Sequence, residues 1–139
     1  MRLDLEKLGE FARRYTAAWC SQDARSVAEF FAPNGSLTIN QGCPAVGRQA
    51  IGKAAQSFMT AFPDLYVAMD DLILRGEGAE YHWTLTGTNN GPGGTGCPVH
   101  ISGFEIWEIG KDGLIATSQG HFDDAEYQRQ LKYGSPGGK

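Results

Sequence analysis

The chain has 139 residues, of which 41% are hydrophobic and 20% charged, and its formal net charge is −4. These figures predict one ordinary globular domain and argue against disorder. The acidic balance gives no support for binding to nucleic acid or to an anionic membrane.

The lengths of the apolar runs and the spacing of the cysteines argue against membrane, zinc-binding and disulfide-rich classes of protein. No apolar run approaches the roughly 20 residues of a membrane span, and the first residues predict an amphipathic helix instead of a signal peptide. The three cysteines form no CxxC pair, so neither a zinc site nor a disulfide framework is predicted. We therefore expect a cytoplasmic location.

The first half of the chain predicts helices. Apolar residues at three- and four-residue spacing indicate a first helix over roughly residues 4–20. Asp23 is typical of an N-cap and begins a second helix, which should end at Pro33 because proline cannot continue the hydrogen-bond ladder. A short strand over 36–40 and a third helix over 48–62 complete this half.

The second half changes to strand periodicity. Short connections predict antiparallel pairing between four strands, at 65–74, 79–88, 98–109 and 114–122. A last helix over 124–131 precedes a tail, 134–139, that we expect to be flexible. Helices followed by strands indicate an α+β fold, a single domain over 1–133 in which three N-terminal helices pack in the concave face of a strongly curved, mostly antiparallel sheet.

The last strand carries the first candidate site. Strand alternation places Gln119, His121 and Asp123 on one face, opposite Ser118 and its neighbours. If that face lines an apolar pocket, Asp123 is a candidate acid/base, because desolvation raises the proton affinity of a carboxylate. His121 could assist it and Gln119 could donate a hydrogen bond to a ligand. Alternatively, Asp123 caps the helix that follows.

A second candidate lies on the preceding strand. Glu105 alternates with apolar residues, among them Trp107, on a strand that is expected to be buried on both faces. A buried glutamate is costly unless it is paired or protonated. It is therefore a second acid in the pocket, the partner of an arginine or histidine, or a residue at an exposed edge.

Aromatic residues supply candidate pocket walls. Tyr15 and Trp19 on the first helix belong to the core or close the pocket from the helix side. Trp83 alternates with polar residues on its strand, and the sequence leaves open which set lines the pocket. The open end of such a curved sheet is a natural ligand site.

Several local strings occur in an order that resembles the SnoaL-like polyketide cyclase group of the nuclear-transport-factor-2-like superfamily. They are Phe31-Ala32-Pro33-Asn34-Gly35, Gly47-Arg48-Gln49-Ala50-Ile51, Phe62-Pro63-Asp64-Leu65, the stretch 83–89, Asp112-Gly113-Leu114-Ile115, and Phe122-Asp123 followed by Arg129-Gln130-Leu131.

The resemblance implies a conical α+β barrel with a deep pocket, and a homodimer formed through the sheet. It also implies that Asp123 acts as acid/base in an intramolecular aldol closure without cofactor or metal. Glu105 and Trp107 stand where the cyclases place hydrogen-bonding side chains, but they differ from those in type.

Three functions follow as hypotheses. The first is a cofactor-independent cyclase or isomerase that acts on a hydrophobic carbonyl compound by proton transfer. The second is a non-catalytic module that binds a small ligand or mediates dimerisation. Epoxide hydrolysis ranks below both, because it needs a water held between two carboxylates with an arginine nearby.

Overall fold

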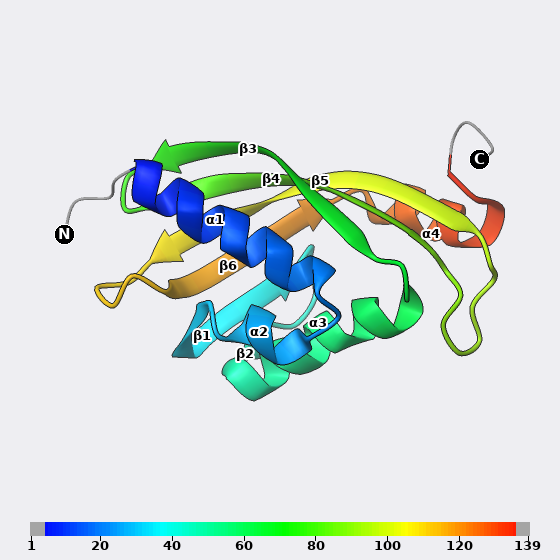
Figure 1. Cartoon of the computed structure of the whole chain (residues 1–139), viewed down its shortest axis with the longest axis horizontal. Helices are drawn as coiled ribbons and strands as arrows, with labels where there is room; N and C mark the ends of the chain where they lie inside the picture. Colours follow the sequence, from blue (N-terminus) through cyan, green and yellow to red (C-terminus); the bar gives the residue numbers. More distant parts are fainter. Residues whose placement is uncertain (1–4, 136–139) are drawn as a thin grey trace.

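A computed structural model describes residues 5–135 of the chain (Figure 1). Its helices are α1 (Leu5–Cys20), α2 (Ala24–Ala28), α3 (Arg48–Ala61) and α4 (Asp124–Tyr133). Its strands are β1 (Phe31–Ile39), β2 (Ala45–Val46), β3 (Tyr66–Arg75), β4 (Gly78–Thr88), β5 (Pro98–Ile109) and β6 (Ile115–Phe122). The predicted flexible tail lies mostly outside the described residues.

The six strands form one mixed sheet in the order β2-β1-β6-β5-β4-β3. Neighbours pair antiparallel except β1 and β6, which run parallel, with Leu37 opposite Ser118. The α+β class and the curved, mostly antiparallel sheet are confirmed. The sheet is open, with β2 and β3 at its edges, so the cone is not a closed barrel.

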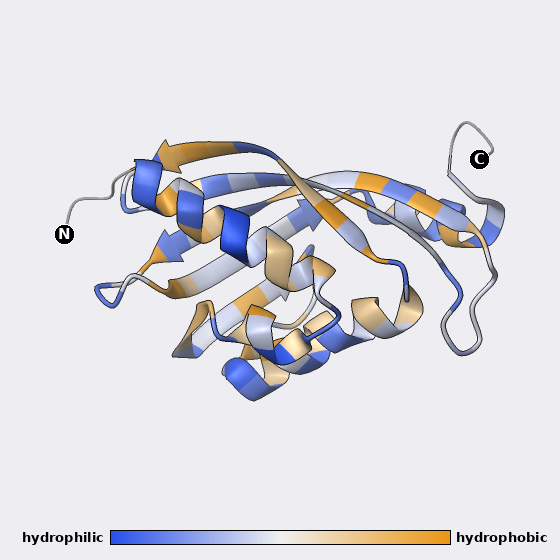
Figure 2. Ribbon diagram, in the orientation of Figure 1, coloured by the Kyte–Doolittle hydropathy of each residue, from blue (hydrophilic) through white to orange (hydrophobic). Residues whose placement is uncertain are grey.

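The helices cover one side of this sheet. Helix α1 packs against β3, α2 packs against α3, and α4 packs against β5 (Figure 1). Hydrophobic and hydrophilic residues alternate along β5, as expected for a strand with one covered face (Figure 2). Helix α1 brings Tyr15 and Trp19 into the core, where they meet Phe31, Phe62 and Trp107.

The second helix is shorter than the sequence predicts. Asp23 is the N-cap, and its side chain accepts a hydrogen bond from Arg25 N. The helix ends at Ala28, however, because Phe31 already pairs with Ile115 of β6. Tertiary pairing therefore begins the strand before the proline that was expected to end the helix.

Helix α4 is fixed to the sheet by one buried amide. The Gln130 side chain accepts a hydrogen bond from the backbone N–H of His100 at 2.7 Å and donates one to Glu126 at 2.8 Å. The bond from His100 holds α4 against β5, and the bond to Glu126 lies within α4.

No helix among residues 5–135 is both long and apolar enough to cross a membrane.

Candidate functional site

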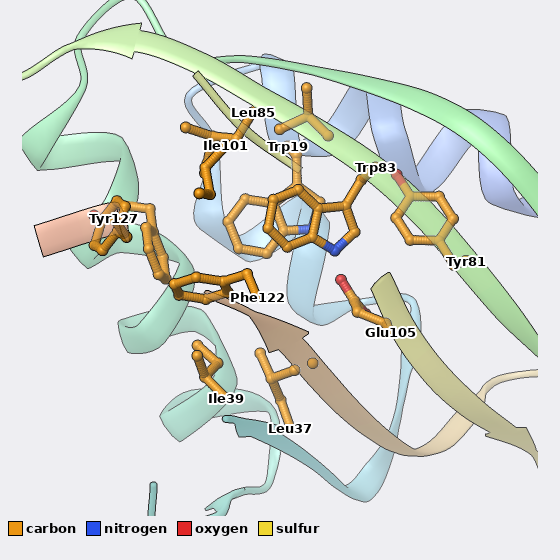
Figure 3. Close-up of a pocket in the computed structure, with 13 residues that line it drawn as sticks. Trp19, Leu37, Ile39, Tyr81, Trp83, Leu85, Ile101, Glu105, Phe122 and Tyr127 are labelled. Atoms are coloured by element: carbon orange, nitrogen blue, oxygen red, sulfur yellow. The ribbon is translucent and has the colours of Figure 1, made fainter. Parts of the chain in front are cut away.

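A cavity of about 60 Å³, called the inner cavity below, lies between the concave face of the sheet and the helices (Figure 3). Thirteen residues line it, and all except Glu105 and Gly120 are apolar or aromatic. They are Trp19, Leu37, Ile39, Phe58, Val67, Tyr81, Trp83, Leu85, Ile101, Glu105, Gly120, Phe122 and Tyr127. Such a cavity suits a small, apolar ligand or part of one.

Glu105 is the only carboxyl group in the wall of the inner cavity. Its side chain is buried, and three side chains from three elements donate hydrogen bonds to it. Tyr15 of α1 lies 3.0 Å from Oε1, Trp107 Nε1 of β5 lies 2.9 Å from it, and Ser118 Oγ of β6 lies 2.7 Å from it. Among residues 5–135, no arginine or histidine donates a hydrogen bond to this carboxyl group.

The two oxygens of this carboxyl group differ in environment. All three donors reach Oε1, whereas Oε2 receives only the Tyr15 hydroxyl at 3.2 Å, a bond that Oε1 shares. A carboxylate has about four lone-pair positions over its two oxygens. Oε2 consequently keeps the capacity to take a proton or to bind a ligand.

Burial changes the proton affinity of this group. Desolvation raises the pKa of the Glu105 carboxyl group above its ordinary value of 4.5, and the hydrogen bonds from Trp107, Ser118 and Tyr15 oppose that rise in part. Burial, together with the nearby Glu105, also raises the pKa of Tyr15 well above 10. Tyr15 is thus a stable hydrogen-bond donor to Glu105.

Tyr15 and Trp107 hold the acid in place without lining the cavity. The Tyr15 ring packs edge-on against Trp107, with centroids 5.2 Å apart, and Trp107 stacks on Tyr81 at 4.9 Å. Tyr15 was expected to belong to the core or to close the pocket, and Trp107 to stand where the cyclases place hydrogen-bonding side chains. The structure places them behind Glu105, where they orient it. Trp19 and Trp83 do line the cavity.

The inward face of β6 is the opposite of the one expected to line the pocket. Gly120 and Phe122 line the inner cavity and Ser118 contacts Glu105, whereas Gln119 is exposed on the outer face. Small residues at 118 and 120 leave room for the carboxyl group opposite, since Glu105 pairs with Gly120. Ser118 was missed because a lone serine carries little signal.

Asp123 lies at the start of α4, outside the inner cavity. Its exposed side chain accepts a hydrogen bond from Glu126 N at 3.1 Å and so caps the helix. Asp123 is thus not in the wall of the inner cavity, where Glu105 is. The capping alternative is the one that the structure bears out.

His121 and Asp123 instead border a wider outer hollow of about 1000 Å³. Four side chains stand between this hollow and the inner cavity and line both, namely Ile39, Phe58, Phe122 and Tyr127. Phe122 packs edge-on against Tyr127, with centroids 5.4 Å apart. His121 pairs with Phe104, whereas Glu105 pairs with Gly120, so His121 and Glu105 lie on opposite faces of the sheet.

Metal ligands do not gather in the described part of the chain. Across residues 5–135 no three histidine, cysteine, aspartate or glutamate side chains come close enough to hold an ion.

Solved structures place this arrangement in the ketosteroid isomerase-like class of α+β cones. A protein of Catenulispora acidiphila DSM 44928 with that fold, solved with trimethylamine, is 15% identical, with a TM-score of 0.77 over 88% of this chain and 92% of that one. TsrD of Streptomyces laurentii is 25% identical, with a TM-score of 0.81 over 94% and 98% of the two chains.

Within that class the chain belongs to the SnoaL-like polyketide cyclase family, whose model matches residues 9–131. SalBIII, described as an epoxide hydrolase/cyclase-like enzyme in pyran ring formation of the polyether salinomycin, is 18% identical, with a TM-score of 0.75 over 88% of this chain and 95% of that one. No curated protein matches the chain.

Proposed function

We propose that the protein is a cofactor-independent enzyme that moves a proton on a hydrophobic carbonyl compound, with Glu105 as the acid/base. The observation that carries this proposal is a buried carboxyl group in an otherwise apolar cavity, with three donors on Oε1 and only the shared Tyr15 hydroxyl on Oε2. Membership of the cyclase family supports the same class of chemistry.

The proposed step begins with ionised Glu105. The C–H bond next to the substrate carbonyl breaks, its electron pair becomes the enolate, and the proton goes to Oε2 of Glu105. The protonated acid then returns that proton to carbon or to oxygen, which isomerises the substrate or follows ring closure. Burial raises the pKa of this carboxyl group, which makes its protonated form easier to reach and so favours both acceptance and return of the proton.

Exchange of the α-hydrogens of cyclohexanone in D₂O, followed by proton NMR, tests this proposal. The wild type should accelerate exchange, and Glu105→Gln should abolish the acceleration, because the amide cannot accept the proton. Asp123→Asn is the matched control, since asparagine keeps the helix cap and residue 123 lies outside the inner cavity.

Loss of exchange in Asp123→Asn with retention in Glu105→Gln would contradict the assignment of Glu105. Binding of cyclohexanone with no exchange above buffer would point to the alternative, a non-catalytic module that binds small ligands. Epoxide hydrolysis finds less support, because the inner cavity has a single carboxyl group and no arginine in its wall.

We further propose a homodimer through the outer face of the sheet. Phe104 on β5 lies between two histidine rings, with centroids 5.4 Å from His82 and 5.1 Å from His121, and the nearby Ile106 is 40% exposed. Sedimentation velocity tests this. Ile106→Glu should shift the protein to monomer, whereas Leu5→Glu, a matched change at an exposed residue of α1, should not.

A further inference from the structure

The indole N–H of Trp83 has no hydrogen-bond partner. Among the side chains of residues 5–135, Trp83 Nε1 is the only buried nitrogen or oxygen without a partner. The indole of Trp107 differs, because its N–H donates to Glu105. A buried donor left unpaired costs on the order of 1–3 kcal/mol, so such a group calls for an explanation.

The Trp83 indole is held in its position by its neighbours. On β5 the residue paired with Trp83 is Gly103, and a Cβ added there would lie 2.6 Å from Trp83 Cζ2. The missing side chain lets the ring lie over the strand. Phe122 packs edge-on against the indole from β6, with centroids 5.9 Å apart. The unpaired N–H therefore belongs to a ring enclosed on two sides.

This N–H lies in the same cavity as the proposed acid. Trp83 and Glu105 both line the inner cavity, and Figure 3 shows the indole nitrogen turned toward the Glu105 carboxyl group. No hydrogen bond joins the two. An indole nitrogen can only donate, so what completes this site is an acceptor atom on a ligand.

We propose that Trp83 Nε1–H binds the carbonyl oxygen of the substrate and stabilises the negative charge that develops on it. The substrate class is then a neutral compound that brings a ketone-type oxygen into the inner cavity. No lysine or arginine lines this cavity, so a carboxylate or phosphate would lack a countercharge there. This inference deepens the proposed function and rests on it for the reacting acid.

Two ligands of the same shape separate a hydrogen bond from simple burial. Cyclohexanone has an acceptor oxygen where methylenecyclohexane has a CH₂ group. The protein contains three tryptophans, so its ¹⁵N-labelled form should give three indole N–H signals, and the one missing in Trp83→Phe belongs to Trp83. Cyclohexanone should move that signal downfield, and methylenecyclohexane should leave its proton shift nearly unchanged.

Affinities supply a second readout. The wild type should bind cyclohexanone roughly five- to tenfold more tightly than methylenecyclohexane, the ratio that one net hydrogen bond gives. Trp83→Phe should remove this preference while it retains binding of the hydrocarbon. Trp19→Phe, a matched change at another tryptophan of the cavity wall, should keep the preference.

The inference is overturned if the Trp83 signal responds alike to the two ligands, or if Trp83→Phe keeps the preference for the ketone. Where Trp83→Phe fails to fold, the signals missing in Trp19→Phe and in Trp107→Phe identify the Trp83 signal by elimination, and its wild-type shift decides the matter. A ketone-specific shift without Glu105-dependent exchange would overturn the proposed function alone. Exchange without that shift would overturn only the role of Trp83.

Discussion

The Tyr15 hydroxyl lies 3.0 Å from Glu105 Oε1, although the two residues are 90 positions apart in the sequence. This contact joins the first helix to the central strand at the one carboxyl group of the inner cavity. The stability of the fold and the proton affinity of Glu105 are consequently linked at this point.

The stability of the protein should depend on the ionisation of Glu105. Its pKa is raised in the folded state, so between about 4.5 and that raised value the folded protein binds more protons than the unfolded chain. The free energy of unfolding should therefore fall as the pH rises through this window. Urea unfolding at several pH values should show that Glu105→Gln reduces this slope.

The control for that experiment is Glu108→Gln on the same strand. Glu108 is exposed and accepts a hydrogen bond from Thr117 at 3.2 Å. This variant should keep the wild-type pH dependence. An unchanged slope in Glu105→Gln would contradict the burial of an ionisable group at position 105.

Tyr15→Phe should raise the pKa of Glu105 further, because the ionised carboxylate loses one of its three donors. The lost hydrogen bond should also lower the free energy of unfolding by about 1 kcal/mol. Carboxyl ¹³C NMR titration measures the pKa. Tyr81→Phe is the control, because the Tyr81 hydroxyl pairs with Thr16 and leaves Glu105 with all its donors.

Asp123→Ala should destabilise the protein by about 0.5–2 kcal/mol through loss of the α4 cap. Asp123→Asn should cost much less, because asparagine caps almost as well. Thermal unfolding of the two variants measures this difference. Equal losses in both would mean that the charge of Asp123, and not its cap, is what matters.

Gly103→Ala should destabilise the protein by about 1–3 kcal/mol, since the added methyl group would lie 2.4 Å from the His121 carbonyl oxygen and 2.6 Å from Trp83 Cζ2. Gly52→Ala should act in the opposite direction. In α3 the new Cβ meets nothing closer than 3.9 Å, and alanine favours helix by up to about 1 kcal/mol. Chemical denaturation of both variants tests the contrast.

The sequence predicted the fold better than the site. Helix and strand periodicity placed β5 correctly, and Glu105 was identified because a glutamate within an apolar strand demands a partner. The difference lies at the end of β6, where the polar residues His121 and Asp123 were expected to line the pocket and Gly120 and Phe122 line it instead. Which face of a strand looks inward depends on its register with its neighbours, and here Gly120 opposite Glu105 decides it.

Other parts of the site had no local signal at all. Nothing in the sequence near Ser118 indicates that its hydroxyl reaches Glu105, since the contact depends on strand pairing. The position of the Trp83 ring likewise depends on a glycine on the adjacent strand. Both features arise only when distant segments are brought together.

The parallel pairing of β1 with β6 has a consequence for synthesis of the chain on the ribosome. Phe31 of β1 pairs with Ile115 of β6, so the backbone groups on that edge of β1 have no strand partner until β6 has left the ribosome. Such long-range closure makes folding slow. A nascent chain that lacks β6 also lacks Ser118, one of the three side chains that donate a hydrogen bond to Glu105.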